Sequence, residues 1–162
     1  RSPGLVPAVF FGRDAGITGS ATLMGAPPRS DSRTVTFHAR SVVLKHPQNL
    51  CYLLGLADHP ESPERYLLLQ RDFEHLEGVE EAPSYYLEWC GPNGGGWGGV
   101  DAVAQTAGRL ELEFDEAVGQ LLGLRQLIIT FDVGVVDDAI LATRLRSIFQ
   151  GCDTRLALAG EQ

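Results

Sequence analysis

Residues 109–150 read RLELEFDEAVGQLLGLRQLIITFDVGVVDDAILATRLRSIFQ, and this stretch decides the fold class of the chain. Apolar and polar side chains alternate over residues 109–114, which predicts a strand that is buried on one face. Residues 115–122 are long enough for two turns of helix, and the apolar run at 126–131 predicts another, buried strand. The stretch therefore combines strands with helix, and few helical crossovers separate the strands.

The clearest element of this stretch is an amphipathic helix at residues 135–150. Leu141, Leu145 and Ile148 fall at positions i, i+4 and i+7, so they form one apolar stripe. Carboxylates in the first turn and arginines in the last turn complement the helix dipole, and Gly151 supplies a stop. We expect the helix to pack on the sheet through its apolar stripe.

Strand patterns also precede this stretch. β-Branched and aromatic side chains predict strands at 34–44 and 51–56, which we expect in one sheet, and the apolar run at 65–71 predicts a strand buried on both faces. Alternation at 85–89 predicts a half-buried strand with Tyr86 and Glu88 on its polar side, and a strand-like segment at 100–104 completes the set. The predicted fold class is α+β, a mostly antiparallel sheet with a C-terminal amphipathic helix packed on it.

The length of 162 residues fits one domain. Residues 1–33 are rich in glycine, proline and small polar side chains, which predicts a flexible or loop-rich arm. We expect residues 34–152 to form a single α+β domain and residues 153–162 to form a C-terminal tail.

The charge of the chain is uneven. Of the formal net charge of −8, residues 1–57 contribute +4, from six Lys/Arg against two Asp, and the remaining residues contribute −12. Such a field repels phosphate backbones and attracts basic surfaces. Direct binding of nucleic acid is not expected.

Cysteine usage and hydropathy indicate the compartment. Cys51, Cys90 and Cys152 are widely separated and form no CxxC pair, which favours free thiols in a reducing compartment. No apolar run approaches the roughly 18 residues that are needed to cross a bilayer. We therefore expect a cytoplasmic protein that does not enter the membrane.

The sequence contains a formal dinucleotide-binding motif but no metal-binding motif. Gly94, Gly96 and Gly99 satisfy GxGxxG, but a dinucleotide site needs this motif to open a helix, and a strand-like segment follows here. A glycine-rich hairpin turn that displays Trp97 explains the run better. The four histidines show no metal-ligand spacing. No cofactor and no metal are predicted.

Catalytic patterns are weak. GxSxG is absent, whereas a Cys–His pair such as Cys51 with His46 and a carboxylate pair such as Glu111 with Glu113 stay open as alternatives. Nothing marks the cysteine as activated, and adjacent acidic side chains are commonly solvated. We predict a binding protein without catalytic residues.

An acidic stretch follows the strand at 65–71. DFEHLEGVEE at residues 72–81 has five carboxylates and no basic side chain, so its charges repel one another and favour either a solvated loop or a contact surface for a basic partner. Tryptophan and tyrosine dominate binding hot spots, which favours nearby aromatics as anchors. The predicted partner-binding residues are Asp72, Glu74, Glu77, Glu80, Glu81 and Trp97.

An alternative from another class is a small-ligand or carbohydrate-binding module. Tyr85, Trp89 and Trp97 would then form a stacking platform. A glycan screen together with tryptophan fluorescence would distinguish this alternative from a protein-binding role.

The second half of the chain also carries a resemblance. YLLLQR at 66–71, YYLEW at 85–89, GGVDAV at 98–103, RLELEFDE at 109–116, and ITFDV followed by LRSIF within 129–149 occur in order. With these segments the chain resembles the immunity protein ten family of bacterial polymorphic toxin systems over about residues 65–150. The first 60 residues fall outside the resemblance, and the glycines at 94–96 are more numerous than the family leads us to expect.

The resemblance implies a cytoplasmic protein of the toxin-producing bacterium that binds and neutralises a cognate toxin domain, with residues 34–152 as an immunity-like domain. It implies no catalytic residues. A basic nuclease is a candidate toxin, because an acidic surface can occupy a phosphate-binding groove. The oligomeric state is not indicated.

Overall fold

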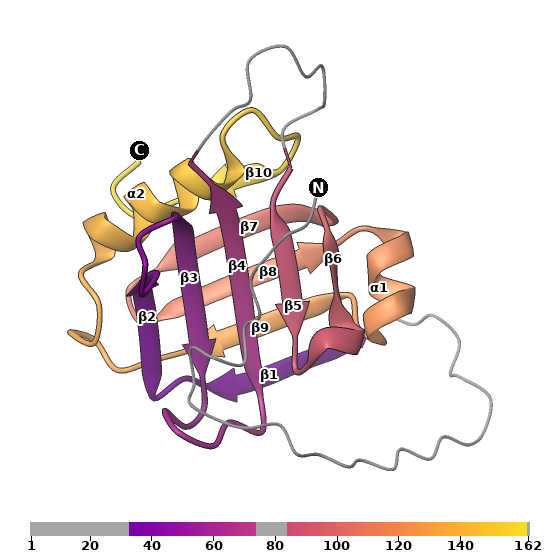
Figure 1. Cartoon of the computed structure of the whole chain (residues 1–162), viewed down its shortest axis with the longest axis horizontal. Helices are drawn as coiled ribbons and strands as arrows, with labels where there is room; N and C mark the ends of the chain where they lie inside the picture. The colour runs from indigo at the N-terminus through magenta and orange to yellow at the C-terminus, as the bar shows by residue number, and fades with distance from the viewer. Residues whose placement is uncertain (1–32, 74–83, 162) are drawn as a thin grey trace.

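The computed structural model describes residues 33–73 and 84–161. Two five-stranded sheets lie face to face, and the strands of one run across the strands of the other (Figure 1). The inner faces of both sheets contribute to one apolar core, which includes Leu54 and Leu69 from one sheet and Leu112 and Leu127 from the other. Burial of these side chains is the main force that holds the two layers together.

The first sheet, shown in the order of its strands, consists of β1 (Thr34–His38), β9 (Gln126–Thr130), β8 (Arg109–Phe114), β7 (Val100–Thr106) and β10 (Arg155–Ala157). Its three central strands pair antiparallel, whereas β1 and β10 are added in parallel at the two edges. β8 and β9 alternate between buried and more exposed side chains, as a strand with one solvent-facing side does.

The second sheet consists of β2 (Ser41–Lys45), β3 (Cys51–Ala57), β4 (Tyr66–Asp72), β5 (Tyr86–Trp89) and β6 (Gly95–Trp97). All its neighbouring strands pair antiparallel. Residues 67–71 of β4 are buried on both faces, as the apolar run predicts.

The expectation that 34–44 and 51–56 share one sheet is wrong. β1 belongs to the first sheet, and β2 and β3 belong to the second. The chain changes sheets at Ala39 and Arg40, because the Ala39 amide donates to Thr130 in the first sheet and the Arg40 amide donates to Ala57 in the second. A period-two pattern shows which face is buried but carries no information about the partner strand.

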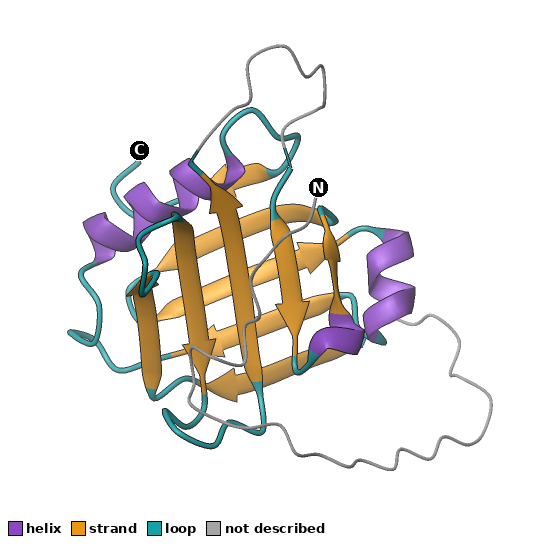
Figure 2. Ribbon diagram, viewed as in Figure 1, coloured by secondary structure: helices purple, strands orange, loops and turns teal. Residues whose placement is uncertain are grey.

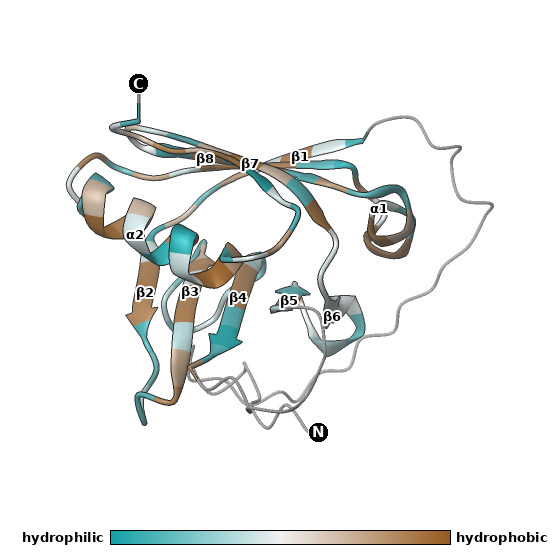
Figure 3. Ribbon diagram, turned by 90° about the horizontal axis from the view of Figure 1, so that it is seen from above, coloured by the Kyte–Doolittle hydropathy of each residue, from teal (hydrophilic) through white to brown (hydrophobic). Residues whose placement is uncertain are grey.

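Two α-helices and a short 3₁₀ helix, Pro92–Gly94, complete the described part of the fold (Figure 2). α1 (Glu116–Leu122) is capped by the Asp115 carboxylate, which accepts from the Val118 amide, and ends at Gly123 with φ 77°. α2 (Asp138–Phe149) starts later than predicted, because Asp137 is its N-cap and the Asp137 carboxylate accepts from the amides of Ala139 and Ile140. Figure 3 shows both helices on the side of the first sheet that faces the second sheet.

The prediction of a mainly antiparallel α+β fold with a packed C-terminal helix is confirmed. α2 contacts β3 and β4 through a buried stripe that includes Leu141, Leu145 and Ile148. Residues 155–157, which fall within the expected tail, form β10. Residues 1–32 of the expected arm lie outside the described residues.

Candidate partner-binding surface

Asp72 is the described member of the predicted acidic stretch, and it ends β4 with an exposed side chain. It pairs in register with Cys51 of β3. Burial raises the pKa of the Cys51 thiol to about 11, and the Asp72 charge adds to this effect. The thiol is therefore protonated at neutral pH, so it is not an activated nucleophile. Glu74, Glu77, Glu80 and Glu81 lie outside the described residues.

Trp97 is the last residue of β6, the edge strand of the second sheet. It follows the glycine-rich turn rather than standing at its tip, and it is 54% exposed. Its ring meets the Tyr86 ring edge-on, with 5.7 Å between the centroids. An exposed indole supported from one side by a second aromatic ring is well suited to anchor a partner.

The strand register brings Asp72 and Trp97 to one face and one end of the second sheet. Gln70 is opposite Tyr86, and Tyr86 is opposite Trp97. Asp72 lies two residues beyond Gln70, so it points to the same side. Two strand spacings across the sheet and two residues along it separate the two positions, which places them about 12 Å apart. We call the side of the second sheet that points away from the core its outer face.

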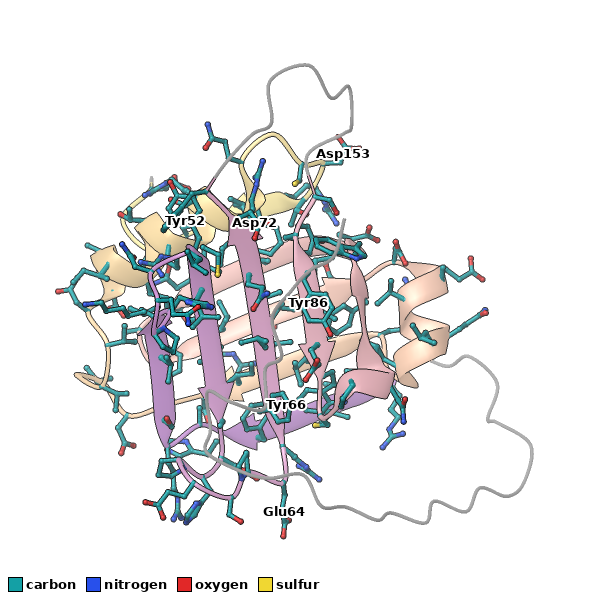
Figure 4. All side chains as sticks on the ribbon, in the orientation of Figure 1. Tyr52, Glu64, Tyr66, Asp72, Tyr86 and Asp153 are labelled. Carbon is teal, nitrogen blue, oxygen red and sulfur yellow. The ribbon has the colours of Figure 1, made fainter. Side chains whose placement is uncertain are left out.

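A buried carboxylate lies on the same outer face. Glu88 of β5 is 1% exposed, and its two oxygens accept hydrogen bonds from the hydroxyls of Tyr66 and Tyr86. Figure 4 shows both tyrosines on the side of the second sheet that is turned towards the viewer. Burial, followed by the bond to Glu88, raises the pKa of each phenol well above its ordinary value. Both phenols are therefore neutral donors at physiological pH.

Gln70 of β4 lies next to this group and is also withdrawn from water. It is 3% exposed, and its side-chain oxygen accepts no hydrogen bond. The alternation at 85–89 predicts Glu88 on a polar, solvent-facing side, so its burial is a departure from the sequence pattern. The apolar run at 65–71, which predicts burial on both faces of β4, is the sequence signal that this face is not ordinary solvent-facing surface.

A glycine makes room for the tyrosine hydroxyl. An added Cβ at Gly95 would stand 2.4 Å from the Tyr86 hydroxyl oxygen. Tyr86 and Glu88 both belong to β5, and Gly95 of β6 is opposite Glu88, so the hydroxyl lies against Gly95 where it donates to the carboxylate. This contact explains one glycine of the run 94–96 by packing.

The run also does not form the loop of a dinucleotide site. Pro92–Gly94 form a short 3₁₀ turn, and β6 and β7 follow. The strand–loop–helix geometry that such a site requires is therefore not present at these glycines.

A cleft of about 370 Å³ lies at the GGVD segment and is lined in part by Gly98 and Gly99. Asp101, Asp115 and Asp153 line it. None of its lining residues is basic.

Gly99 has φ +101°, and a Cβ there would stand 2.2 Å from a methyl group of Val118, so close packing on α1 requires glycine. Within residues 33–73 and 84–161, no group of three or more His, Cys, Asp or Glu is arranged to hold a metal ion.

The three aromatic residues of the alternative stacking platform are not brought together. Tyr85 is 2% exposed and packs edge-on against Phe149, with 4.7 Å between ring centroids. Trp89 packs against Phe37 in the core, whereas Trp97 lies on the outer face. A carbohydrate platform made of these rings is therefore not formed.

No helix in the described segments is both long and apolar enough to span a membrane.

The comparison with protein families shows which family the chain belongs to. The model of the family described as Immunity protein 10 matches residues 38–140, and no curated protein matches the chain. The expected family is confirmed, but its bounds differ from those predicted. The match begins at residue 38, so that β2 and β3 are included, and it ends at residue 140, before the LRSIF segment. Because the match covers more than half of the 162 residues, the chain belongs to the Immunity protein 10 family.

Proposed function

We propose that this chain binds and neutralises a cognate bacterial toxin domain, without catalysis, in the cytoplasm of the bacterium that makes the toxin. The observation that carries the proposal is membership in the Immunity protein 10 family. A net charge of −8 supports it, because an acidic protein associates rapidly with a basic partner. A nuclease, which binds phosphate through lysine and arginine, is the toxin class that this charge favours.

The outer face near Asp72 and Trp97 is the contact surface in this proposal. An exposed carboxylate and an exposed indole at one end of the second sheet support it. The further members are Glu74, Glu77, Glu80 and Glu81, which follow Asp72 in the sequence. Protection against an active toxin requires a Kd of about nanomolar or tighter. An interface of roughly 1,600 Å² commonly supplies such affinity.

The first experiment is co-expression of this chain with the toxin domain encoded beside it. Immunity predicts that the cells survive and that the two proteins purify together. Cell death without a complex would contradict the proposed function.

The acidic surface has its own test. Replacing Asp72, Glu74 and Glu77 by alanine should weaken toxin binding by roughly tenfold to a hundredfold and flatten its salt dependence, because exposed charges act through screened attraction. The measurement is Kd by calorimetry at low and at physiological salt.

The control is the triple replacement of Glu61, Glu64 and Asp132 by alanine, which removes the same charge from exposed positions elsewhere. Glu64 and Asp72 lie at opposite ends of β4 (Figure 4). Equal effects of the two triple variants would show that net charge matters and that this surface does not.

A further inference from the structure

Glu88 is the one buried carboxylate among the residues that the structure describes. A buried charge is costly unless other groups compensate it, and a nearby cation is the usual compensation. None of the ion pairs found within residues 33–73 and 84–161 includes Glu88. Its two hydrogen-bond partners, Tyr66 and Tyr86, are neutral donors. The negative charge of this carboxylate is thus left without a counter-ion in the described part of the chain.

The carboxylate also has unused capacity to accept hydrogen bonds. Its two oxygens together offer about four lone-pair sites. The phenols use one site on each oxygen. Each oxygen can therefore accept another donor without losing the bond that it already has.

Gln70 adds a second acceptor to the same face. Its side-chain oxygen is buried and unpaired, which is costly in a folded protein. Gln70 is opposite Tyr86, and Glu88 lies two residues after Tyr86, so the two side chains are diagonal neighbours at about 7 Å. One ligand with several N–H donors can reach both groups.

Aromatic rings border this cluster on the β6 side. Tyr86 is half-buried, and the exposed Trp97 ring stands edge-on against it. Aromatic faces attract a guanidinium group, which also has five N–H donors in a planar fork. The charge, the unpaired oxygen and the rings all match the same chemical group.

We propose that Glu88, Gln70 and the neighbouring rings of Tyr86 and Trp97 form a receptor for one arginine side chain of the toxin domain. This inference rests on the proposed function and deepens it, because it names the chemistry of a central contact. The arginine enters beside Trp97, where the face is exposed, and donates to the lone pairs of Glu88 that the two phenols leave unused. It supplies the counter-ion that the described fold lacks.

The decisive variant is Glu88→Gln, which keeps the shape of the side chain and removes its charge. With the purified toxin domain we expect an affinity loss on the order of a hundredfold, because removing one partner of a buried, hydrogen-bonded ion pair is costly. Glu111→Gln is the matched control, since Glu111 is a half-buried carboxylate that accepts from Arg109 and Gln126 on the first sheet. Its affinity should equal that of the wild type.

A double-mutant cycle identifies the partner group. Each arginine and lysine of the toxin domain is replaced by alanine and tested against both wild-type and Glu88→Gln protein. One arginine should show a coupling of at least tenfold with Glu88, and its replacement should have little effect once Glu88 is changed. No coupling with any toxin cation would overturn the proposal.

Folding is checked separately by thermal unfolding of each variant. Should Glu88→Gln fail to fold, Gln70→Met replaces it, because this change keeps the volume and removes the unpaired oxygen. It should weaken binding about tenfold without lowering stability. Wild-type affinity of folded Glu88→Gln, or of Gln70→Met in its place, would mean that the cluster is purely internal. Failure of the wild-type chain itself to bind or protect would instead contradict the proposed function.

Discussion

At the scale of single residues, the outer face depends on a close approach between two strands. The Tyr86 hydroxyl donates to Glu88 at 2.6 Å and lies where a Cβ of residue 95 would be. The backbone of Gly95 is extended, a conformation that any residue can adopt, so backbone strain does not explain the glycine. The nearby phenol explains it, because the hydroxyl leaves no room for a Cβ. The missing side chain of Gly95 is therefore a condition for the hydrogen bond between Tyr86 and Glu88.

Replacing Gly95 by alanine should displace the Tyr86 hydroxyl and break its bond to Glu88. We expect a loss of about 1 kcal/mol in the free energy of unfolding, the usual net value of one hydrogen bond. Chemical denaturation checks this value. Gly96→Ala is the matched control on the same strand, because no atom lies within 4 Å of its added Cβ. Equal stability of the two variants would show that the phenol accommodates the methyl group.

At the scale of elements, two arginines join α2 to the second sheet. Arg71 of β4 is buried, and its guanidinium donates to the carbonyls of Ile148 and Gln150 at the end of the helix. Arg144 of α2 donates in the opposite direction, to the carbonyls of Leu44 and Leu53 in β2 and β3. The last carbonyls of a helix lack partners within it, so Arg71 satisfies groups that the helix cannot.

We expect Arg71→Met to lower the free energy of unfolding by about 2 kcal/mol, because the buried Ile148 carbonyl and the part-buried Gln150 carbonyl lose a charged donor. Arg146→Met changes the same residue type on the same helix end, but Arg146 forms an exposed pair with Glu161. Such a pair contributes about 0–1 kcal/mol. Thermal unfolding of both variants measures the difference, and equal losses would contradict a capping role for Arg71.

At the scale of the whole molecule, the tyrosines link stability to alkaline pH. Burial is the largest cause that raises the pKa of Tyr66, Tyr85 and Tyr86 above the ordinary value, which is near 10. A raised pKa means that the folded state holds the proton more tightly than the unfolded state. The resulting stability is fully present below about pH 10 and is lost as the pH rises towards the folded values.

An alkaline titration should therefore show these phenols ionising together with unfolding, not before it. Tyrosinate absorbance and far-ultraviolet circular dichroism, recorded on the same samples, check this coincidence. Glu88→Gln should lower the pH of the transition, because the bond to Glu88 contributes to the raised pKa of Tyr66 and Tyr86. Ionisation of these tyrosines while the protein is still folded would contradict the raised pKa values.

The candidate surface could be predicted only in part. The sequence showed Asp72 as the start of an acidic stretch and Trp97 as an aromatic anchor, and both positions are exposed in the structure. Glu88 was expected on a solvent-facing side, because alternation identifies the two sides of a strand but not what covers each side. The sequence could not show that Tyr85 and Trp89 pack in the core whereas Trp97 is exposed, because the same aromatic residue types occur in cores and at interfaces.

What the sequence determined by itself is local: the strands, the capped helices, the α+β class and the family. Asp115 and Gly123 mark both ends of α1, and the spacing of Leu141, Leu145 and Ile148 marks the packed face of α2. These features depend on neighbours within a few residues, so the pattern along the chain contains them. Only the tertiary structure decided that the chain changes sheets at Ala39 and Arg40, and that Gln70 and Glu88 meet on a buried outer face. Both depend on which strands pair, and pairing is decided by the burial of whole faces between segments that are far apart in the sequence.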